Sequence, residues 1–223
     1  MKGRISEVFE SIQGEGIYLG ERQLFVRFFG CNLKCRYCDT RMDNFVEYEP
    51  EDLLKELKKY GNGFHSVSFT GGEPLLQKDF LKEALRLIRE SGFRNYLETN
   101  GTLSESLSEI IDYLDFVAMD LKLPSSTGLS DFWDTHRRFL QIASQKEVFL
   151  KAVICRDTKE EDLRAALRFI QDNNKSVVLV LQPNSHEDDN CLKEKIEGFR
   201  NICLDEKVST CIIPQVHKVI NIK

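Results

Sequence analysis

Residues 24–40 read LFVRFFGCNLKCRYCDT, an apolar run typical of a buried strand that leads through Gly30 into three closely spaced cysteines. Cys31, Cys35 and Cys38 have the spacing C-x3-C-x2-C. Structural zinc sites usually have four protein ligands, and simple cubane clusters are held by four thiolates. Three thiolates on a four-iron cluster would leave one iron open to a substrate or cofactor. The spacing therefore indicates a reactive site, and a zinc loop with a remote fourth ligand is the alternative.

The composition suits one domain that spans residues 1–223, with 41% hydrophobic residues to form a core. No apolar run approaches 20 residues, and the N-terminus lacks the apolar middle of a signal peptide. We therefore expect a cytoplasmic protein with no membrane contact. The net charge of −5 comes with no basic stripe, which argues against nucleic-acid binding.

Seven cysteines are an odd number and too unevenly spread for a secreted disulfide framework. Cys155, Cys191, Cys203 and Cys211 stand alone in the sequence. We expect each of them to be buried as a small hydrophobic side chain.

Apolar runs alternate with amphipathic segments along the chain, which predicts an α/β fold built from βαβ units with a mainly parallel sheet. The expected strands cover residues 24–29, 66–70, 96–99, 116–121, 148–154 and 177–181, and the clearest helices cover 50–60, 78–89 and 159–171. About six repeats are too few for a full eight-unit barrel. The prediction is therefore a partial, open (β/α)6-type barrel.

Chemically distinctive residues follow these strands, where parallel sheets place their ligands. Cys31 follows the first strand, the turn Thr70-Gly71-Gly72-Glu73-Pro74 the second, and the segment Glu98-Thr99-Asn100-Gly101-Thr102 the third. Asp120 and Lys122 follow the fourth, and Gln182-Pro183 the sixth. We expect these residues to meet at one edge of the sheet.

CxxxCxxC followed by TGGEP resembles the radical S-adenosylmethionine (SAM) superfamily. More narrowly, successive blocks resemble the 7-carboxy-7-deazaguanine synthase family: ESIQGEGIYLG, FVRFFGCNLKCRYCDT, SFTGGEPLLQ, LETNGT, MDLKLPSS, LQPN and PQVHK. These blocks run from Glu10 to Lys218. The element Gln13-Gly14-Glu15-Gly16 and the ending Cys38-Asp39-Thr40 narrow the resemblance to the synthases.

The resemblance implies that Cys31, Cys35 and Cys38 hold a [4Fe–4S] cluster whose open iron binds SAM, and that Thr40 helps to hold Mg²⁺. It implies conversion of 6-carboxy-5,6,7,8-tetrahydropterin to 7-carboxy-7-deazaguanine with loss of ammonia, in queuosine and 7-deazapurine biosynthesis. A 5′-deoxyadenosyl radical would take hydrogen from C6, the ring would contract, and hydrogen return would regenerate SAM. The protein's part in such chemistry is to position the cofactor and to exclude side reactions.

The same resemblance gives two sets of binding residues. The expected SAM contacts are Tyr37, Cys38, Asp39, Gly71, Gly72, Glu73, Asp120, Leu121, Lys122, Gln182, Pro183 and Asn184. The expected pterin contacts are Ile12, Gln13, Gly14, Glu15, Arg27, Thr70, Glu98 and His217.

For some of these residues there is a physical reason for the expected contact, and for some there is a simpler structural explanation. Gly71 and Gly72 would let backbone approach the methionine moiety closely. Arg27 alternates with Phe25 and Phe29, so its guanidinium is expected to be buried or to face the cavity, and a buried arginine needs an anion. That anion is the substrate carboxylate or, in the simpler alternative, Glu15 or Glu98.

The resemblance also suggests a homodimer and a flavodoxin or ferredoxin-type electron donor. The alternatives are a glycyl-radical-enzyme activase, which would present an open site to a protein backbone, and a non-catalytic zinc-stabilised module. Residues 41–48 resemble nothing assignable and are candidates for a pocket wall or a reductase-docking surface. The C-terminal carboxylate, at residues 221–223, is a further candidate for the substrate site.

Overall fold

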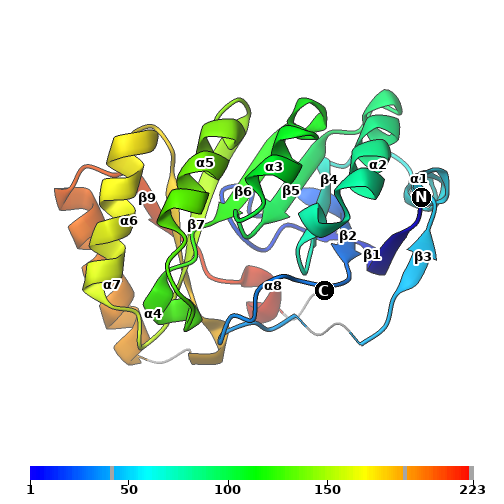
Figure 1. Cartoon of the computed structure of the whole chain (residues 1–223). Helices are drawn as coiled ribbons and strands as arrows, with labels where there is room; N and C mark the ends of the chain where they lie inside the picture. Colours follow the sequence, from blue (N-terminus) through cyan, green and yellow to red (C-terminus); the bar gives the residue numbers. More distant parts are fainter. Residues whose placement is uncertain (41–42, 188–189, 221–223) are drawn as a thin grey trace.

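The computed structural model describes residues 1–40, 43–187 and 190–220. These residues form a nine-stranded sheet in the order β3-β1-β2-β4-β5-β6-β7-β8-β9 (Figure 1). The strands are β1 Gly3–Ile12, β2 Arg22–Phe28, β3 Val46–Tyr48, β4 Ser66–Gly71, β5 Asn95–Thr99, β6 Phe116–Asp120, β7 Glu147–Ile154, β8 Leu179–Pro183 and β9 Thr210–Ile212. The α-helices are α1 Pro50–Lys58, α2 Lys78–Glu90, α3 Ser104–Ser108, α4 Pro124–Thr127, α5 Trp133–Ala143, α6 Glu160–Asn173, α7 Asn190–Asp205 and α8 Val216–Val219.

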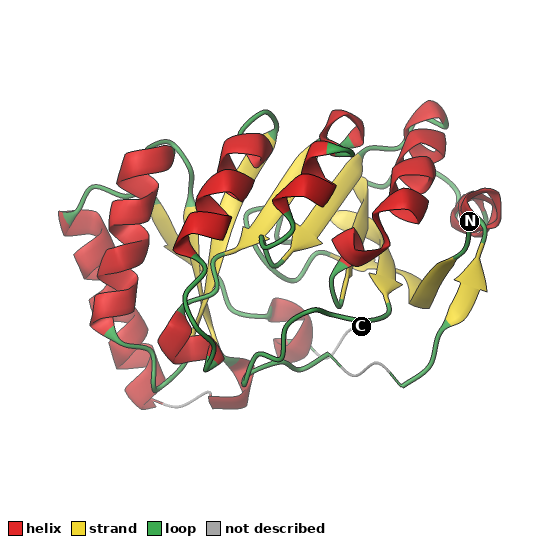
Figure 2. Cartoon of the chain, viewed as in Figure 1, coloured by secondary structure: helices red, strands yellow, loops and turns green. Residues whose placement is uncertain are grey.

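Strands β2, β4, β5, β6, β7, β8 and β9 run parallel to one another. Strand β1 is antiparallel to both of its neighbours, β2 and β3. The longer helices line up along one side of the sheet, and α8 lies across from them near the opposite side (Figure 2). The two edge strands, β3 and β9, do not pair with each other. The sheet is therefore an open barrel, which confirms the predicted fold class.

Helix α1 shows how local sequence defines these elements. Pro50 occupies the first turn, where its missing N–H removes no helical hydrogen bond. Glu51 and Asp52 lie near the N-terminus, where acidic groups suit the helix dipole. Leu53 and Leu57 are buried on the face toward the sheet. The helix thus begins where the sequence predicts, although it ends at Lys58 instead of residue 60.

Each face of the sheet has its own hydrophobic core. The larger core lies between the sheet and the helices and includes Leu150, Ala152 and Ile154 of β7. The opposite, concave face carries a smaller cluster in which Phe149 of β7 packs with Tyr96, Phe116, Ala118 and Val180. Residues of β7 therefore alternate between two cores, as the two-residue period of a strand requires.

Some sequence expectations were wrong or incomplete. Strands β1, β3 and β9 were not predicted, and the strand expected at 177–181 is found at Leu179–Pro183. Cys155 and Cys203 are buried as expected, but Cys191 is exposed at the start of α7 and Cys211 is only half-buried.

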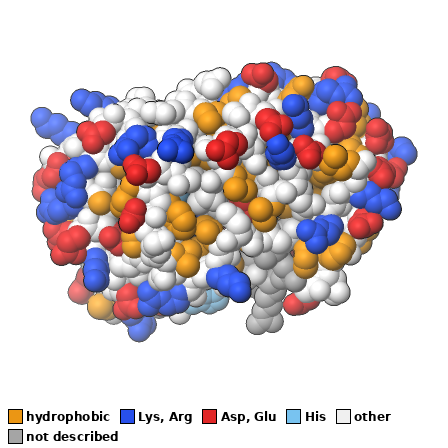
Figure 3. Space-filling model, viewed as in Figure 1, with side chains coloured by type: hydrophobic (Ala, Val, Ile, Leu, Met, Phe, Trp, Pro, Cys, Tyr) orange, Lys and Arg blue, Asp and Glu red, His pale blue; other side chains and the backbone are white. Residues whose placement is uncertain are grey.

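The described part of the segment 41–48 does not line a pocket wall; instead it supplies β3, which pairs with β1. Residues 41–42 and the C-terminal carboxylate lie outside the described residues. No helix among the described residues is both long and apolar enough to span a membrane. On the face in Figure 3, basic and acidic side chains are interspersed over the helices.

Candidate active site

A cavity of about 440 Å³ opens at the carboxyl edge of the parallel strands, within the size range of small-molecule sites. All but two of the predicted site residues line it: Ile12, Gln13, Gly14, Glu15, Arg27, Cys31, Cys35, Tyr37, Cys38, Asp39, Thr40, Thr70, Gly71, Gly72, Glu98, Asp120, Lys122, Gln182, Pro183, Asn184 and His217. The expectation that the strand ends meet is confirmed. Glu73 and Leu121 are the two that do not line the cavity.

The three cysteines lie on the loop after β2, at one end of this cavity. Arg36 anchors the loop, because its amide donates to Thr127 O at 2.9 Å and its guanidinium pairs with Asp157 at 2.9 Å. Cys31 and Cys38 are exposed and Cys35 is half-buried. Burial raises the pKa of the Cys31 and Cys35 thiols.

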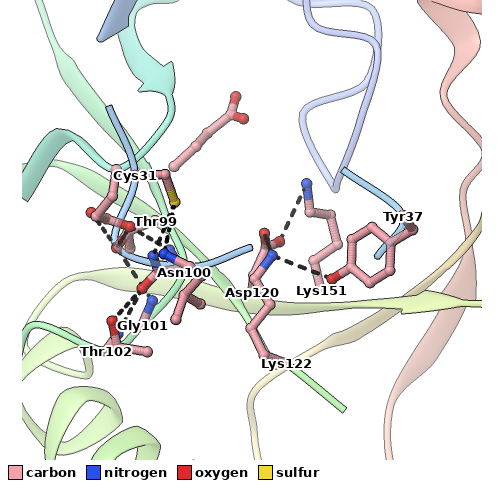
Figure 4. Close-up of polar contacts among 12 residues, drawn as sticks. Cys31, Tyr37, Thr99, Asn100, Gly101, Thr102, Asp120, Lys122 and Lys151 are labelled. Carbon is pink, nitrogen blue, oxygen red and sulfur yellow. Dashed lines mark hydrogen bonds and ion pairs between the residues drawn. The ribbon is translucent and has the colours of Figure 1, made fainter. Parts of the chain in front are cut away.

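The donor set of this loop suits iron and sulfide. Three thiolates on one loop are soft ligands of the kind that hold iron–sulfur clusters. Asn100 supplies an outer hydrogen bond, because its Nδ2 lies 3.9 Å from Cys31 Sγ (Figure 4). Among the residues described, no three His, Cys, Asp or Glu side chains are gathered tightly around a single point as they stand.

Gly71 and Gly72 are required by the backbone itself as well as by any ligand. A Cβ on Gly72 would lie 1.8 Å from Gly30 O, and one on Gly71 would lie 2.5 Å from Phe28 O. Gly71 also has a φ of +113°, which L side chains rarely adopt. These two glycines let the turn after β4 pack directly against the start of the cysteine loop.

Glu73 has its side chain turned into the protein and does not line the cavity, and its expected contact with SAM stays a prediction. Its carboxylate has no solvent exposure and accepts hydrogen bonds from Leu75 N at 3.1 Å, Asn100 N at 2.8 Å and Thr99 Oγ1 at 2.9 Å. Burial is the main influence and raises the pKa of Glu73 to about 7. Glu73 therefore joins the turn after β4 to the loop after β5.

Leu121 does not line the cavity either, and its expected contact with SAM stays a prediction. Its side chain is buried in the larger core on the helix side of the sheet. The side chains of Asp120 and Lys122 face the cavity on either side of it in the sequence, as alternation along an extended chain requires.

Asp120 lies between two lysines at the base of the cavity (Figure 4). Its Oδ2 is 2.6 Å from Lys122 Nζ and its Oδ1 is 3.3 Å from Lys151 Nζ. Lys122 also donates to the Tyr37 hydroxyl at 3.3 Å. Burial would raise the pKa of Asp120, but the two lysines outweigh it and the pKa is lowered. Both lysines stay charged and hold Asp120 as a carboxylate.

The pterin-side residues form a second network. Gln13 Nε2 donates to Glu98 Oε1 at 2.9 Å and to Gln23 Oε1 at 3.1 Å. Ser68 and Thr70 also donate to Glu98, each at 3.1 Å. The carboxylate of Glu98 is thus held by neutral donors beside the cavity. Such a group can accept hydrogen bonds from the N–H edge of a heterocycle.

Arg27 faces the cavity, and its partner within the protein is neither Glu15 nor Glu98. Its guanidinium pairs with Glu7 at 3.2 Å and lies 5.6 Å from the centre of the Phe9 ring. Both residues stand on β1, which the sequence patterns did not predict. Glu15 instead pairs with Lys151 at 2.5 Å. A quarter of the Arg27 side chain remains exposed, which leaves donors for an anion.

The segment from Gln215 to Lys218 closes the cavity opposite the sheet. Gln215 Nε2 donates to Glu15 Oε1 at 2.7 Å and to Asp39 Oδ2 at 3.2 Å, and Lys218 pairs with Asp39. A Cβ on Gly14 would lie 2.3 Å from His217 Nδ1. Gly14 is therefore needed where the imidazole packs against the loop after β1.

Cavity residues with hydrogen bonds or ion pairs that were not predicted as site residues include Glu7, Thr99, Asn100, Lys151, Gln215 and Lys218. A signal existed for Lys151, because a lysine inside the apolar run of residues 148–154 must find an anion if the strand is buried. Asn100 and Gln215 stood inside the quoted blocks LETNGT and PQVHK. Glu7 could not be predicted as a cavity residue, because the sequence patterns did not predict β1, the strand that carries it.

Comparisons with known proteins agree with this geometry. The radical SAM superfamily model matches residues 25–192. A Geobacter sulfurreducens protein named 7-carboxy-7-deazaguanine synthase is 35% identical, over 96% of this chain and 95% of its own length. One of the same name from Archaeoglobus fulgidus is 35% identical over 100% of both chains.

This chain belongs to the 7-carboxy-7-deazaguanine synthase family. Its fold agrees, because the crystal structure of QueE from Escherichia coli superposes with a TM-score of 0.68 at 23% identity, over 95% of this chain and 94% of that one. Streptococcus suis SuiB bound to its precursor peptide shares the fold more distantly, with a TM-score of 0.63 at 18% identity over 82% of this chain and 46% of that one.

As a member of the synthase family the chain is a radical SAM enzyme of the queuosine pathway that acts on a small molecule with the help of a reductant. Its cofactors are a [4Fe–4S] cluster, SAM and Mg²⁺. The cysteine loop fits the cluster by its donor set, and the remaining cavity residues supply the polar groups that SAM and a heterocyclic substrate need.

Proposed function

We propose that this chain converts 6-carboxy-5,6,7,8-tetrahydropterin to 7-carboxy-7-deazaguanine inside the cavity at the carboxyl edge of its sheet. One observation carries the proposal: the same cavity has three cysteine thiols at one end and the network of Gln13, Thr70 and Glu98 at the other. When bound, the cluster and SAM supply the radical that removes a hydrogen atom from the substrate. The residues of the protein bind and orient SAM and the substrate, and they close the cavity around them.

We assign the SAM end of the cavity to the residues around the cysteine loop. Gly72 and the turn after β4 would present backbone to the methionine moiety. Asp120 and Lys122, fixed against each other at 2.6 Å, suit the ribose hydroxyls and the carboxylate of SAM. Gln182 and Asn184, both buried at the end of β8, would bind the adenosine end. Tyr37, Cys38 and Asp39 complete this side.

We assign the pterin end to the residues between β1, β4 and β5. Glu98 would accept hydrogen bonds from the N–H groups of the pterin, and Gln13 would keep Glu98 in place. Arg27 would pair with the substrate carboxylate, which enters beside its contact with Glu7. Thr40 would contribute its hydroxyl to Mg²⁺, an ion that keeps oxygen ligands from water and substrate. Ile12, Gly14, Glu15 and His217 would line the rest.

The test is anaerobic turnover of the reconstituted protein with SAM, reductant, Mg²⁺ and the carboxytetrahydropterin. We expect 7-carboxy-7-deazaguanine and ammonia to appear in equal amounts while SAM is regenerated and not consumed. The variant Cys35→Ala should lose both bound iron and turnover, whereas Cys191→Ala, at an exposed position on α7, should keep both. A protein that binds stoichiometric zinc, or one that holds the cluster and yields no product, would contradict the assignment.

We further infer that residues 1–223 act as one radical SAM domain in the cytoplasm, as a homodimer, with a flavodoxin or ferredoxin-type protein as electron donor. Sedimentation of the loaded enzyme tests the dimer. Reduction of the cluster by purified flavodoxin and ferredoxin tests the donor.

A further inference from the structure

Lys151 is a charged residue in the middle of a buried strand. It lies on the concave face of β7 with Phe149 and Val153, and only 11% of its side chain is exposed. A cation removed from water in this way must be paired to be tolerated. The structure gives it two anions, Glu15 at 2.5 Å and Asp120 at 3.3 Å.

These two anions belong to opposite halves of the cavity. Asp120 stands on the SAM side, where Lys122 holds its other oxygen at 2.6 Å. Glu15 stands on the pterin side, next to Gly14 and two residues from Gln13, whose Oε1 accepts a hydrogen bond from the Glu15 amide at 3.0 Å. Charges therefore alternate along the line Glu15, Lys151, Asp120 and Lys122. Lys151 is the link between the halves.

The same contacts fix the charge states. Burial alone would raise the pKa of Glu15, but Lys151 and Gln215 lower it to about 2. Burial alone would lower the pKa of Lys151, and its two carboxylate neighbours raise it well above its usual value. All members of the line therefore stay ionised at neutral pH. A displacement of one carboxylate changes the attraction that positions the other.

We propose that Lys151 is a positioning residue that couples the two halves of the cavity, so that SAM bound against Asp120 aligns Glu15 and its loop for the pterin. This inference rests on the proposed function. Because binding linkage is reciprocal, the pterin must also tighten SAM binding by the same factor. Couplings of this kind are typically about 5- to 150-fold.

Binding measured without reductant, so that no turnover occurs, tests the proposal on the cluster-loaded enzyme. We expect SAM to tighten the affinity for carboxytetrahydropterin by at least about fivefold in the wild type. Lys151→Met removes the charge and shortens the unbranched side chain by one atom, and should bring this factor to within about twofold of one. Lys175→Met, at an exposed position before β8, is the matched control and should keep the wild-type factor.

The variant Lys151→Met leaves Glu15 and Asp120 with one cation fewer, which threatens folding. Glu15→Gln combined with Lys151→Met removes one charge of each sign and keeps Asp120 paired with Lys122. In the Glu15→Gln background, Lys151→Met should leave the pterin affinity within about twofold and still weaken SAM binding, because its effect on the pterin passes through Glu15. A purely structural role would lower the pterin affinity equally in both backgrounds.

Steady-state kinetics provide a second readout. Lys151→Met should raise KM for the pterin by about tenfold and change kcat by less than about threefold, because Lys151 acts through Glu15 and Asp120 and does not touch the reacting atoms. A wild-type coupling factor near one, or full coupling in Lys151→Met, would overturn the proposal while turnover remained intact. Absence of wild-type turnover would instead overturn the proposed function and this inference with it.

Discussion

Glu73 shows how contacts in the interior of the protein fix the side chain of a motif residue. Its carboxylate caps Leu75 N and Asn100 N, which lie on loops after two neighbouring strands. Asn100 in turn reaches Cys31 Sγ. The glutamate of TGGEP therefore stabilises the cysteine loop indirectly, through Asn100. Its direction could not be predicted from sequence, because its partners Thr99 and Asn100 come from another strand.

Glu73→Gln should change how stability depends on pH. The pKa of Glu73 is about 7 in the folded protein against 4.5 as its ordinary value, so the folded state binds the extra proton between these pH values. The stability that this proton supplies is complete below pH 4.5 and is lost as pH rises through 7. From pH 5 to 8 the wild type should therefore lose about 1–3 kcal/mol relative to Glu73→Gln.

Urea unfolding of the cluster-free chain at several pH values measures this difference. Glu197→Gln, on the exposed face of α7, is the control and should follow the wild type. Burial lowers the pKa of His136 to about 4, so His136 makes the folded protein more stable as the pH rises from 4 to 6.5. This contribution is the same in both proteins, so it does not affect the difference between them. Identical pH slopes for wild type and Glu73→Gln would refute the prediction.

At the scale of elements, the C-terminal helix α8 and the residue before it join segments that are far apart in sequence. Gln215 contacts both Glu15 and Asp39, and Lys218 contacts Asp39 and Ser185 Oγ, the latter at 2.8 Å. A four-residue helix has little stability of its own. Its place is therefore set by these polar contacts, which brace the loop after β1 against the cysteine loop.

Gln215→Leu should loosen the loop after β1. Gln13 N donates to Glu21 O at 2.7 Å and Gly20 N to Gln13 O at 2.9 Å, and both amides should exchange hydrogen about tenfold faster once Glu15 loses its neutral donor. Hydrogen exchange read by mass spectrometry on peptides from residues 13–21 measures the change. Glu194→Gln, exposed on α7, should exchange as the wild type does. Unchanged exchange in Gln215→Leu would mean that α8 does not brace the loop.

The burial of each strand explains whether it could be predicted from the sequence. The six expected strands lie in the parallel part of the sheet and are mostly buried, so each is rich in apolar side chains. Strand β1 is antiparallel and mostly half-buried, with Glu7 and Glu10 along it, so it lacks an apolar run. Strands β3 and β9 have three residues each and are too short for a pattern. Missing β1 also concealed Glu7, the partner of Arg27.

For the whole molecule, one rule explains why the site could be predicted better than its contacts. Parallel strands bring their carboxyl ends to a common edge, so residues such as Cys31, Glu98 and Asp120 had to meet once the strands were known. Pairings across the cavity depend on side-chain direction and on loops from both ends of the chain. Glu15 and Lys151 are 136 positions apart in the sequence, and no local sequence pattern predicts their contact.

The two cores of the molecule give a prediction that separates stability from binding. Phe139 of α5 has no solvent exposure in the core beneath the helices, and Phe149 is almost as buried on the concave face. Removal of either ring should cost about 3–5 kcal/mol of unfolding free energy. Only Phe149 also packs on the loop after β1, because a Cβ on Gly16 would lie 2.4 Å from its ring.

Phe149→Ala should therefore weaken pterin binding by about tenfold in addition to destabilising the fold, since Gly16 adjoins Glu15 and the loop would lose its support. Phe139→Ala should destabilise the fold by a similar amount and leave pterin affinity within about twofold. Urea unfolding of the cluster-free chains and pterin binding to the loaded enzymes, both at a temperature where each variant is folded, provide the two measurements. Equal loss of pterin affinity in both variants would show that binding follows global stability, and that the concave cluster has no separate part in shaping the cavity.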